Sequence, residues 1–181
     1  MRTIHRQIKV EILCEDELSD EEMQILINAQ HARLKAQAPL SHYWVGAALL
    51  SENGNWYSGC NVERGDYTST THAERNAIDS MIGAEGPAKI KILGISAAPA
   101  HWVLPKDLVN PMLRAFAVDD FCFACAGCLQ VIWDNCCGDI SVPLLVLTQD
   151  RVIARTTIGD AYPMRFGFES LGIDVKEGRK S

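Results

Sequence analysis

Two short segments of the chain contain the residue types that bind a transition metal. The first is Thr71-His72-Ala73-Glu74 and the second is Cys125-Ala126-Gly127-Cys128. A catalytic zinc ion takes three protein ligands and keeps a fourth position for water, and one imidazole with two thiolates suits this borderline-soft ion. The residue types and their spacing therefore predict a zinc site formed by His72, Cys125 and Cys128.

Glu74 follows His72 by two residues and supplies a carboxylate beside the predicted metal. Zinc lowers the pKa of a bound water, so that this water becomes a nucleophile near neutral pH. A carboxylate within reach of the water takes its proton as a general base and returns it as a general acid. Two thiolates and a neutral His72 leave the site formally uncharged, and we expect the helix N-termini to lower the pKa of both thiols.

The same residues also have purely structural explanations. A single Cys-x-x-Cys pair is weak evidence for a catalytic metal, and Cys122 forms a competing pair with Cys125. These cysteines alone favour a structural zinc site or plain helix packing. Thr71 and Glu74 also have the spacing of a capping box, which needs no chemistry.

The composition limits what can surround this site. With 181 residues, 48% of them hydrophobic and 22% charged, the chain is expected to be one soluble globular domain. No apolar run reaches the roughly 18 residues of a membrane span, and the first residues lack the apolar stretch of a secretory signal. The net charge of −6 argues against long nucleic acid as a partner, because such a partner usually requires a basic face.

The seven cysteines favour a reducing compartment. An odd number of cysteines in a chain of this length, without a secretory signal, argues against a disulfide scaffold. We therefore expect a cytoplasmic protein. Outside the predicted metal site, Cys136 and Cys137 are expected to pack on a helix face, because free cysteine is among the most buried residue types.

The pattern of apolar and turn residues predicts the elements that hold the site. Residues 18–36 are expected to form a helix, with Ser19 starting a capping box. Asn53-Gly54 is a strong hairpin signal between strands at 44–50 and 55–62. Further along the chain, the pattern predicts helices at 72–83 and 125–137, and strands at 89–97, 141–149 and 151–156.

Helices that alternate with short strands indicate a layered α/β domain with a mixed sheet. We expect a single domain over residues 1–175, followed by a polar tail at 176–181. Residues 98–121 carry three prolines without a clear period. That length is unusual for an unstructured connection and suggests a functional loop or a short extra helix.

Five segments, in order, resemble the motifs of the cytidine deaminase family of the short-subunit kind. They are Ser41 to Leu49 (S-x-F-P-V-G-A-A-L in the family), Gly59 to Glu63 (G-C-N-V-E), Thr71 to Ile78 ([CH]-A-E-R-x-A-I), Cys125 to Gln130 (C-G-x-C-R-Q) and Thr157 to Gly167 (T-x-G-E-L-L-P-x-x-F-G-P). The His-x-Glu and Cys-x-x-Cys elements are also the general signature of zinc deaminases. The resemblance covers most of residues 20–171, and five ordered matches are far more specific than any one of them.

The resemblance implies a three-layer α/β/α fold with a mixed five-stranded sheet. It implies one Zn²⁺ per chain on the predicted ligands, with Glu74 as the proton shuttle. The substrate-binding residues that it implies are Tyr43, Asn61, Glu63, Ala73, Phe123 and Phe166. Phe166 would reach into the site of a neighbouring subunit, which implies a homo-oligomer, a homotetramer or else a homodimer.

Taken one at a time, some of these residues have simpler explanations. Asn61 fits the end of a strand, and Tyr43 and Phe166 fit ordinary core packing. In the family, Asn61 and Glu63 would bind the ribose hydroxyls, and the roles make sense because an amide and a carboxylate offer donors and acceptors to a diol.

The activity that the resemblance implies is zinc-dependent hydrolytic deamination of cytidine or deoxycytidine to the uridine product, a step of pyrimidine salvage. The partner is then a small pyrimidine nucleoside. One alternative is deamination of another aminopyrimidine nucleoside, of the blasticidin type, and another is a non-catalytic zinc-binding module. A polynucleotide deaminase is disfavoured, because neither the basic track nor the stacking platform that it needs is evident.

Four residues at three places depart from the family pattern. Phe123-Ala124 stands where the family has Ser-Pro, Trp44 replaces another proline, and Leu129 replaces an Arg. In the family, the stretch that contains the first departure lines the pocket around the exocyclic amine, and loss of the proline frees the local φ angle. We hypothesise that N4-substituted cytidines are accepted. Residues 98–121 are expected to form a functional loop, and the alternative is that they form a surface insertion without a catalytic role.

Overall fold

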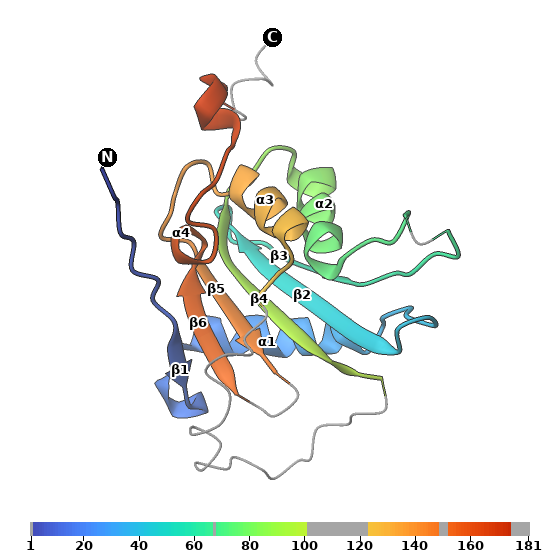
Figure 1. Ribbon diagram of the computed structural model, residues 1–181. Helices are drawn as coiled ribbons and strands as arrows, with labels where there is room; N and C mark the ends of the chain where they lie inside the picture. Colours follow the sequence, from blue (N-terminus) through green and yellow to red (C-terminus); the bar gives the residue numbers. More distant parts are fainter. Residues whose placement is uncertain (1, 67, 101–122, 149–151, 175–181) are drawn as a thin grey trace.

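The structure of the chain is a computed structural model that describes residues 2–66, 68–100, 123–148 and 152–174 (Figure 1). The predicted polar tail at 176–181 lies outside the described residues. The same holds for Cys122 and for all but the first three residues of the predicted insertion at 98–121.

A single mixed sheet forms the middle of the fold. Its six strands lie in the order β1-β6-β5-β4-β2-β3. Their bounds are β1 Glu11–Leu13, β2 Tyr43–Ser51, β3 Trp56–Cys60, β4 Ile90–Pro99, β5 Pro143–Leu147 and β6 Ile153–Thr157. β4 and β5 are parallel, and the other four neighbouring pairs are antiparallel. The predicted mixed sheet is confirmed, but the predicted count of five strands is wrong.

The additional strand is β1, at one edge of the sheet. Its three residues pair with β6, with Glu11 opposite Arg155. Three residues are too few to show the period-two alternation that marks a strand in a sequence. The partner strand lies 144 residues further along the chain, so nothing local signals this pairing. The Arg155 guanidinium binds the carboxylates of Glu11 at 2.8 Å and Glu22 at 2.7 Å, which ties β1 and the first helix to β6.

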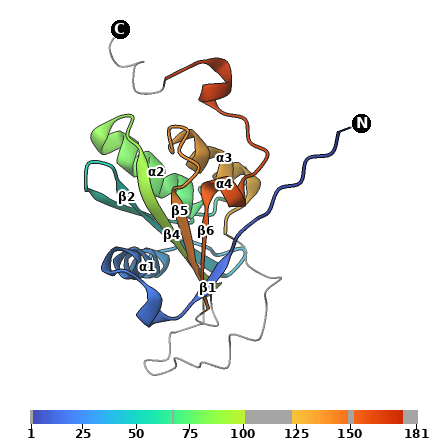
Figure 2. The ribbon, with the colours of Figure 1, turned by 90° about the vertical axis from the view of Figure 1, so that its left-hand side faces the viewer.

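Helices cover both faces of the sheet (Figures 1 and 2). α1 (Asp20–Arg33) lies on one face, and α2 (Ala73–Glu85) and α3 (Ala126–Asp134) lie side by side on the other. The short helical elements are η1 (Glu15–Glu17), α4 (Ile158–Ala161) and η3 (Phe168–Leu171). This arrangement confirms the predicted three-layer α/β/α fold. No helix in the described ranges has both the length and the apolar character needed to cross a membrane.

Local signals predicted the start of α1 correctly. Ser19 is the N-cap, its hydroxyl accepts from the Glu22 amide at 3.2 Å, and the Glu22 carboxylate accepts from the Ser19 amide at 2.9 Å. The helix ends at Arg33 rather than at residue 36. The β2–β3 hairpin is also confirmed, with Gly54 in the left-handed region at φ 85°.

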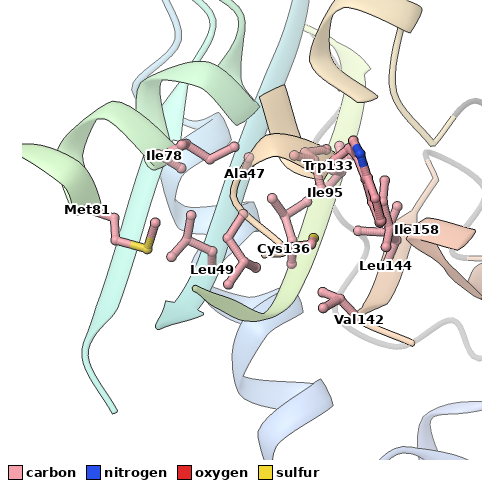
Figure 3. Close-up of a cluster of buried hydrophobic side chains, with 14 of the residues drawn as sticks. Ala47, Leu49, Ile78, Met81, Ile95, Trp133, Cys136, Val142, Leu144 and Ile158 are labelled. Atoms are coloured by element: carbon pink, nitrogen blue, oxygen red, sulfur yellow. The ribbon is translucent and has the colours of Figure 1, made fainter. Parts of the chain in front are cut away.

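Both faces of β2 are buried. Ala47 and Leu49 pack toward α2 and α3, whereas Ala48 and Leu50 pack toward α1, and all four side chains are at most 4% exposed. Alternate residues of a strand point to opposite faces, which explains why this strand reads as a continuous apolar run. Figure 3 shows part of the core on the α2 and α3 side, where side chains from strands and helices meet.

The expectation for Cys136 and Cys137 is only half right. Cys136 is fully buried in the core of Figure 3. Both residues follow the end of α3 at Asp134, however, so neither lies on a helix face. Cys137 is exposed and has a φ of 52°.

Candidate active site

The structure brings His72, Cys125 and Cys128 together. The Nδ1 atom of His72 lies 3.5 Å from the Cys125 Sγ and 3.4 Å from the Cys128 Sγ. All three potential ligand atoms lie within 4.8 Å of one another. Zn–N bonds near 2.0–2.1 Å and Zn–S bonds near 2.3 Å at a tetrahedral angle place N and S ligands about 3.6 Å apart. The donor set and its spacing therefore fit a zinc ion.

Two helix N-termini hold these ligands. His72 is the N-cap of α2, and Cys125 is the N-cap of α3, with Cys128 in the first turn of that helix. Both helices begin where the sequence predicted. The structural alternative of a capping box from Thr71 to Glu74 is wrong, because the N-cap is His72 and no side chain caps α2.

The Cys128 thiol is fully buried. Burial is the main cause that raises its pKa far above the usual range, and the neighbouring Glu74 carboxylate adds to the effect. Burial thus moves the pKa of this thiol in the direction opposite to the lowering expected from the helix N-terminus. Since zinc binds the thiolate, a bound cation has to supply the charge that stabilises it.

Glu74 lies in the first turn of α2 and is 5% exposed. Its carboxylate lies near enough to the Cys128 thiol that its negative charge helps to raise the pKa of that thiol. An acid–base group therefore lies near a predicted zinc ligand. The position suits a residue that exchanges protons with a water on the metal.

Gly59 lets α2 approach the sheet. A Cβ atom added at Gly59 would lie 2.5 Å from the Ala77 nitrogen and 2.7 Å from the Ala73 oxygen. Both distances are too short for any side chain, so only glycine permits this contact between β3 and the first turns of α2. Because that end of the helix carries His72 and Glu74, the position of Gly59 bears directly on the site.

Arg75 is a charged residue near the site to which the sequence analysis assigned no role. A Cβ added at Gly127 would lie 2.6 Å from the Arg75 Nη2, so the guanidinium crosses the first turn of α3 between the two cysteines. The Arg75 Nε is buried and has no hydrogen-bond partner among the described residues. The position of Arg75 within the matched Ala-Glu-Arg motif was the sequence feature that could have indicated a role for it near the site. Arg75 places a positive charge beside Gly127, in the segment between the two cysteines.

Asn61 binds the backbone of β2. Its Oδ1 accepts from the Val45 amide at 2.9 Å, and its Nδ2 donates to the Tyr43 carbonyl at 2.9 Å. The amide thereby continues the β2–β3 pairing past the end of β3, which confirms the strand-end interpretation. These bonds use one of the two N–H groups and one of the two lone pairs of the amide oxygen.

Glu63 holds the loop that precedes β2. Its carboxylate accepts from the Leu40 amide at 2.7 Å and from the Ser41 amide at 3.2 Å. Hydrogen bonds from these two residues lower the pKa of the Glu63 carboxyl, and the bond from Ser41 has the largest effect. A carboxylate has about four acceptor positions, so these contacts leave room for a sugar hydroxyl.

Thr71 joins the Asn61 and Glu63 segment to the metal site. The Val62 amide donates to the Thr71 carbonyl at 2.9 Å, and the Thr71 amide donates to the Val62 carbonyl at 3.0 Å. Thr71 directly precedes His72. The predicted substrate-binding segment and the predicted metal ligand are therefore held together by the backbone.

The other predicted substrate-binding residues differ in their surroundings. Ala73 is fully buried at the start of α2. Phe123 is half-buried against the core on the α2 and α3 side. Tyr43, at the start of β2, is 43% exposed, and Phe166 is 59% exposed. Core packing is therefore wrong as an explanation for Phe166 within one chain.

The fold and the site together define a class of protein. It is a three-layer α/β domain with a His-Cys-Cys metal site at two helix N-termini and a buried carboxylate beside it. The family model described as cytidine and deoxycytidylate deaminase zinc-binding region matches residues 19–142. The chain belongs to the cytidine deaminase family, which is a family of hydrolases.

Individual relatives agree with this assignment. The chain is 32% identical over 153 residues to the cytidine deaminase of Sporosarcina psychrophila, covering 84% of this chain and 96% of the relative. It is 30% identical over 149 residues to that of Halalkalibacterium halodurans, covering 82% and 96%. Among solved structures, the cytidine deaminase of Burkholderia pseudomallei has a TM-score of 0.61 at 25% identity, covering 82% of this chain and all of that one. The Mycobacterium tuberculosis enzyme has a TM-score of 0.56 at 26% identity, covering 82% and 98%.

Proposed function

We propose that this protein deaminates free cytidine and deoxycytidine by hydrolysis, with one zinc ion per chain. The observation that carries the proposal is the site itself. The His72 Nδ1 lies 3.4 and 3.5 Å from two thiols, and the buried Glu74 carboxylate lies near enough to the Cys128 thiol to influence its pKa. A structural zinc site has no need of a general base, so the placement of Glu74 favours catalysis.

The proposed reaction forms a C4–O bond and breaks the C4–N4 bond of cytosine. Bound zinc would supply an activated water near neutral pH. Glu74 would take one proton from the water and pass it to the ring nitrogen N3. It would then take the proton of the new C4 hydroxyl and pass it to the amine, which departs as ammonia while the C4 carbonyl forms. Burial of Glu74 restricts proton exchange with bulk solvent.

We propose that Asn61 and Glu63 bind the sugar hydroxyls. Both side chains are already held by backbone groups of residues 40–45, so little conformational freedom is lost when a nucleoside binds. A substrate without the hydroxyls would leave polar groups unpaired, which makes such sites selective. Tyr43 would pack beside the nucleoside, and the backbone at Ala73 would hold the base carbonyl.

We further propose a homotetramer, with a homodimer as the alternative, that works in cytoplasmic pyrimidine salvage. The Phe166 residue supports the oligomer, since 59% of its surface is exposed within its own chain and is available to a neighbouring subunit. The net charge of −6 supports a small nucleoside rather than a long nucleic acid as the substrate.

Acceptance of N4-substituted cytidines rests on the segment before Cys125. Phe123 and Ala124 both pack against the core, so this stretch is shaped by apolar packing where the family has Ser-Pro. We propose that the pocket around the exocyclic amine differs accordingly. A substrate panel that includes N4-acetylcytidine tests this proposal separately from deamination of cytidine itself.

The test of the proposed function is an ultraviolet assay of the zinc-loaded protein with cytidine, deoxycytidine and N4-acetylcytidine. Glu74→Ala should keep its zinc and its fold but lose turnover by a factor on the order of 10²–10⁴. Asp79→Ala, on an exposed position of the same helix, should behave like the wild type and serves as the matched control.

Other outcomes separate the alternatives. Turnover of none of the three nucleosides by protein that holds zinc would favour another aminopyrimidine substrate or a non-catalytic module. Loss of zinc or unfolding in Glu74→Ala would show that the carboxylate is structural, and the assignment of Glu74 would fail.

A further inference from the structure

Gln130 lies on the metal-binding helix α3, two residues after Cys128, and the proposed mechanism gives it no role. Its Nε2 donates to the Phe166 carbonyl at 2.8 Å and to the Asp134 carboxylate at 2.9 Å. Its Oε1 accepts from the Tyr162 hydroxyl at 3.0 Å. Both N–H groups and one lone pair of the amide are thus in use, and two of the three bonds reach the segment from Tyr162 to Phe166.

The segment 162–166, which we call the Phe166 segment, has further attachments, among them the bond from the Tyr162 amide to the Ile158 carbonyl at 2.9 Å. The Arg165 guanidinium stacks over the Trp133 ring at 4.3 Å, and Trp133 belongs to the buried face of α3. On the other side, the Arg6 Nη1 of the N-terminal segment donates to the Pro163 carbonyl at 2.5 Å. The Phe166 segment is therefore attached to α3 through the Phe166 carbonyl and through the side chains of Tyr162 and Arg165.

The Phe166 ring itself is not held in the same way. It is 59% exposed and lines an open cavity of about 970 Å³ together with Arg6, Trp133 and Tyr162. Gln130 binds the Phe166 carbonyl, which fixes the backbone and leaves the ring available for a contact outside the segment. A fixed backbone that presents an exposed aromatic ring is suited to binding, because little further conformational entropy is lost when the ligand binds.

We propose that Gln130 is a positioning residue for nucleoside binding, which holds the Phe166 segment in a defined place relative to the metal-binding helix. The inference rests on the proposed function, in which the Phe166 ring contacts the pyrimidine nucleoside bound in a neighbouring subunit. Because α3 carries Cys125 and Cys128 of its own site, Gln130 connects the metal site of one subunit to the substrate pocket of the next.

The test compares the zinc-loaded wild type with Gln130→Leu, which removes all three hydrogen bonds at nearly constant volume. We expect the KM for cytidine to rise roughly 3- to 10-fold, the range for loss of one or two net hydrogen bonds, while kcat and zinc content stay within twofold. Tyr162→Phe, which removes one bond, should have a smaller effect. Gln24→Leu is the matched control, since Gln24 is exposed on α1 and its Nε2 bonds only along that helix to Asn28 at 2.9 Å.

A double-variant comparison distinguishes positioning from a general structural role. Phe166→Leu should raise KM on its own, and Gln130→Leu should add less than twofold in that background, since the ring it positions is gone. An unchanged KM in Gln130→Leu, or an undiminished increase in the Phe166→Leu background, would overturn the proposal. A parallel fall in kcat, zinc content and thermal stability would also overturn it.

Limited trypsin cleavage provides a readout that does not depend on activity. Cleavage after Arg165 should be several-fold faster in Gln130→Leu than in the wild type or Gln24→Leu, because the segment loses its attachment to α3. Equal cleavage rates would contradict the proposed attachment even if no cytidine turnover were found. Inactivity of the wild type toward cytidine, with faster cleavage in Gln130→Leu, would instead place the failure in the proposed function.

Discussion

Val62 and Thr71 exchange two backbone hydrogen bonds, at 2.9 and 3.0 Å, although eight residues lie between them along the chain. Asn61 and Glu63 lie on either side of Val62, and His72 follows Thr71. This pair of bonds fixes the distance between the proposed sugar-binding side chains and the metal ligand on α2. A change at either end is therefore expected to affect both nucleoside binding and zinc binding.

Zinc removal should lower the stability of the fold. A metal that binds the folded chain and not the unfolded chain adds its binding free energy to the free energy of unfolding. We expect a chelator to lower Tm and added zinc to restore it. Cys128→Ser should reduce bound zinc well below one per chain and abolish the zinc-dependent rise in Tm, whereas Cys137→Ser, at an exposed cysteine, should retain both. Zinc content by mass spectrometry and Tm by calorimetry check this prediction, and full zinc occupancy in Cys128→Ser would contradict it.

Gly59→Ala should disturb both the fold and the site. The added methyl group would lie 2.5 Å from the Ala77 nitrogen, and overpacking of this kind costs about 1–3 kcal/mol. The helix α2 has to shift, so zinc affinity should fall as well. Gly83→Ala is the control on the same helix, because no atom lies within 4 Å of an added Cβ there. It should stabilise the protein by about 0.5–1 kcal/mol. Urea unfolding and zinc titration measure both effects, and equal stability of the two variants would contradict the prediction.

Glu85 should make stability depend on pH. Its carboxylate accepts hydrogen bonds from Ser51, Asn53, Asn55 and Tyr57. These bonds lower the pKa of Glu85 to about 2, and the bond from Asn55 has the largest effect. A carboxyl whose pKa is lower in the folded than in the unfolded chain stabilises the fold above the unfolded pKa. That contribution is lost as pH falls from about 4.5 toward about 2.

The comparison of wild type with Glu85→Gln isolates this contribution. The wild type should be the more stable at pH 7, and the difference between the two proteins should shrink below pH 4. Zinc loss in acid affects both proteins and cancels in the difference. If the difference in urea midpoint between the wild type and Glu85→Gln stayed constant with pH, the charge of Glu85 would not be the cause of that difference.

Asn61→Ala should lower stability as well as nucleoside affinity. The substitution removes the bonds of the side chain to the Val45 amide and the Tyr43 carbonyl, and each such bond contributes about 0.5–1.5 kcal/mol net to stability. Asn28→Ala, in the middle of α1, should change stability by much less. If Asn61→Ala raised the KM for cytidine without any change in the urea midpoint, the structural role assigned to Asn61 would be wrong.

Short-range patterns were sufficient to predict much of the site. The residue types and spacing of His72, Glu74, Cys125 and Cys128 predicted the three ligands and the adjacent acid, and the structure places all four together. The capping box at Ser19 likewise predicted where α1 begins. Such features depend on neighbouring residues, whose chemical preferences are visible in the chain itself.

Other features came from contacts between residues far apart in the chain. The pairing of β1 with β6, the crossing of Arg75 over Gly127 and the bond from Gln130 to Phe166 leave no local pattern. The choice of His72 rather than Thr71 as N-cap, and of Nδ1 as the atom that faces the cysteines, depends in the same way on how α2 and α3 pack on the sheet. Local preferences therefore determined which groups carry out the chemistry, while long-range packing determined their orientation, because the position of each helix is set by the surface it buries.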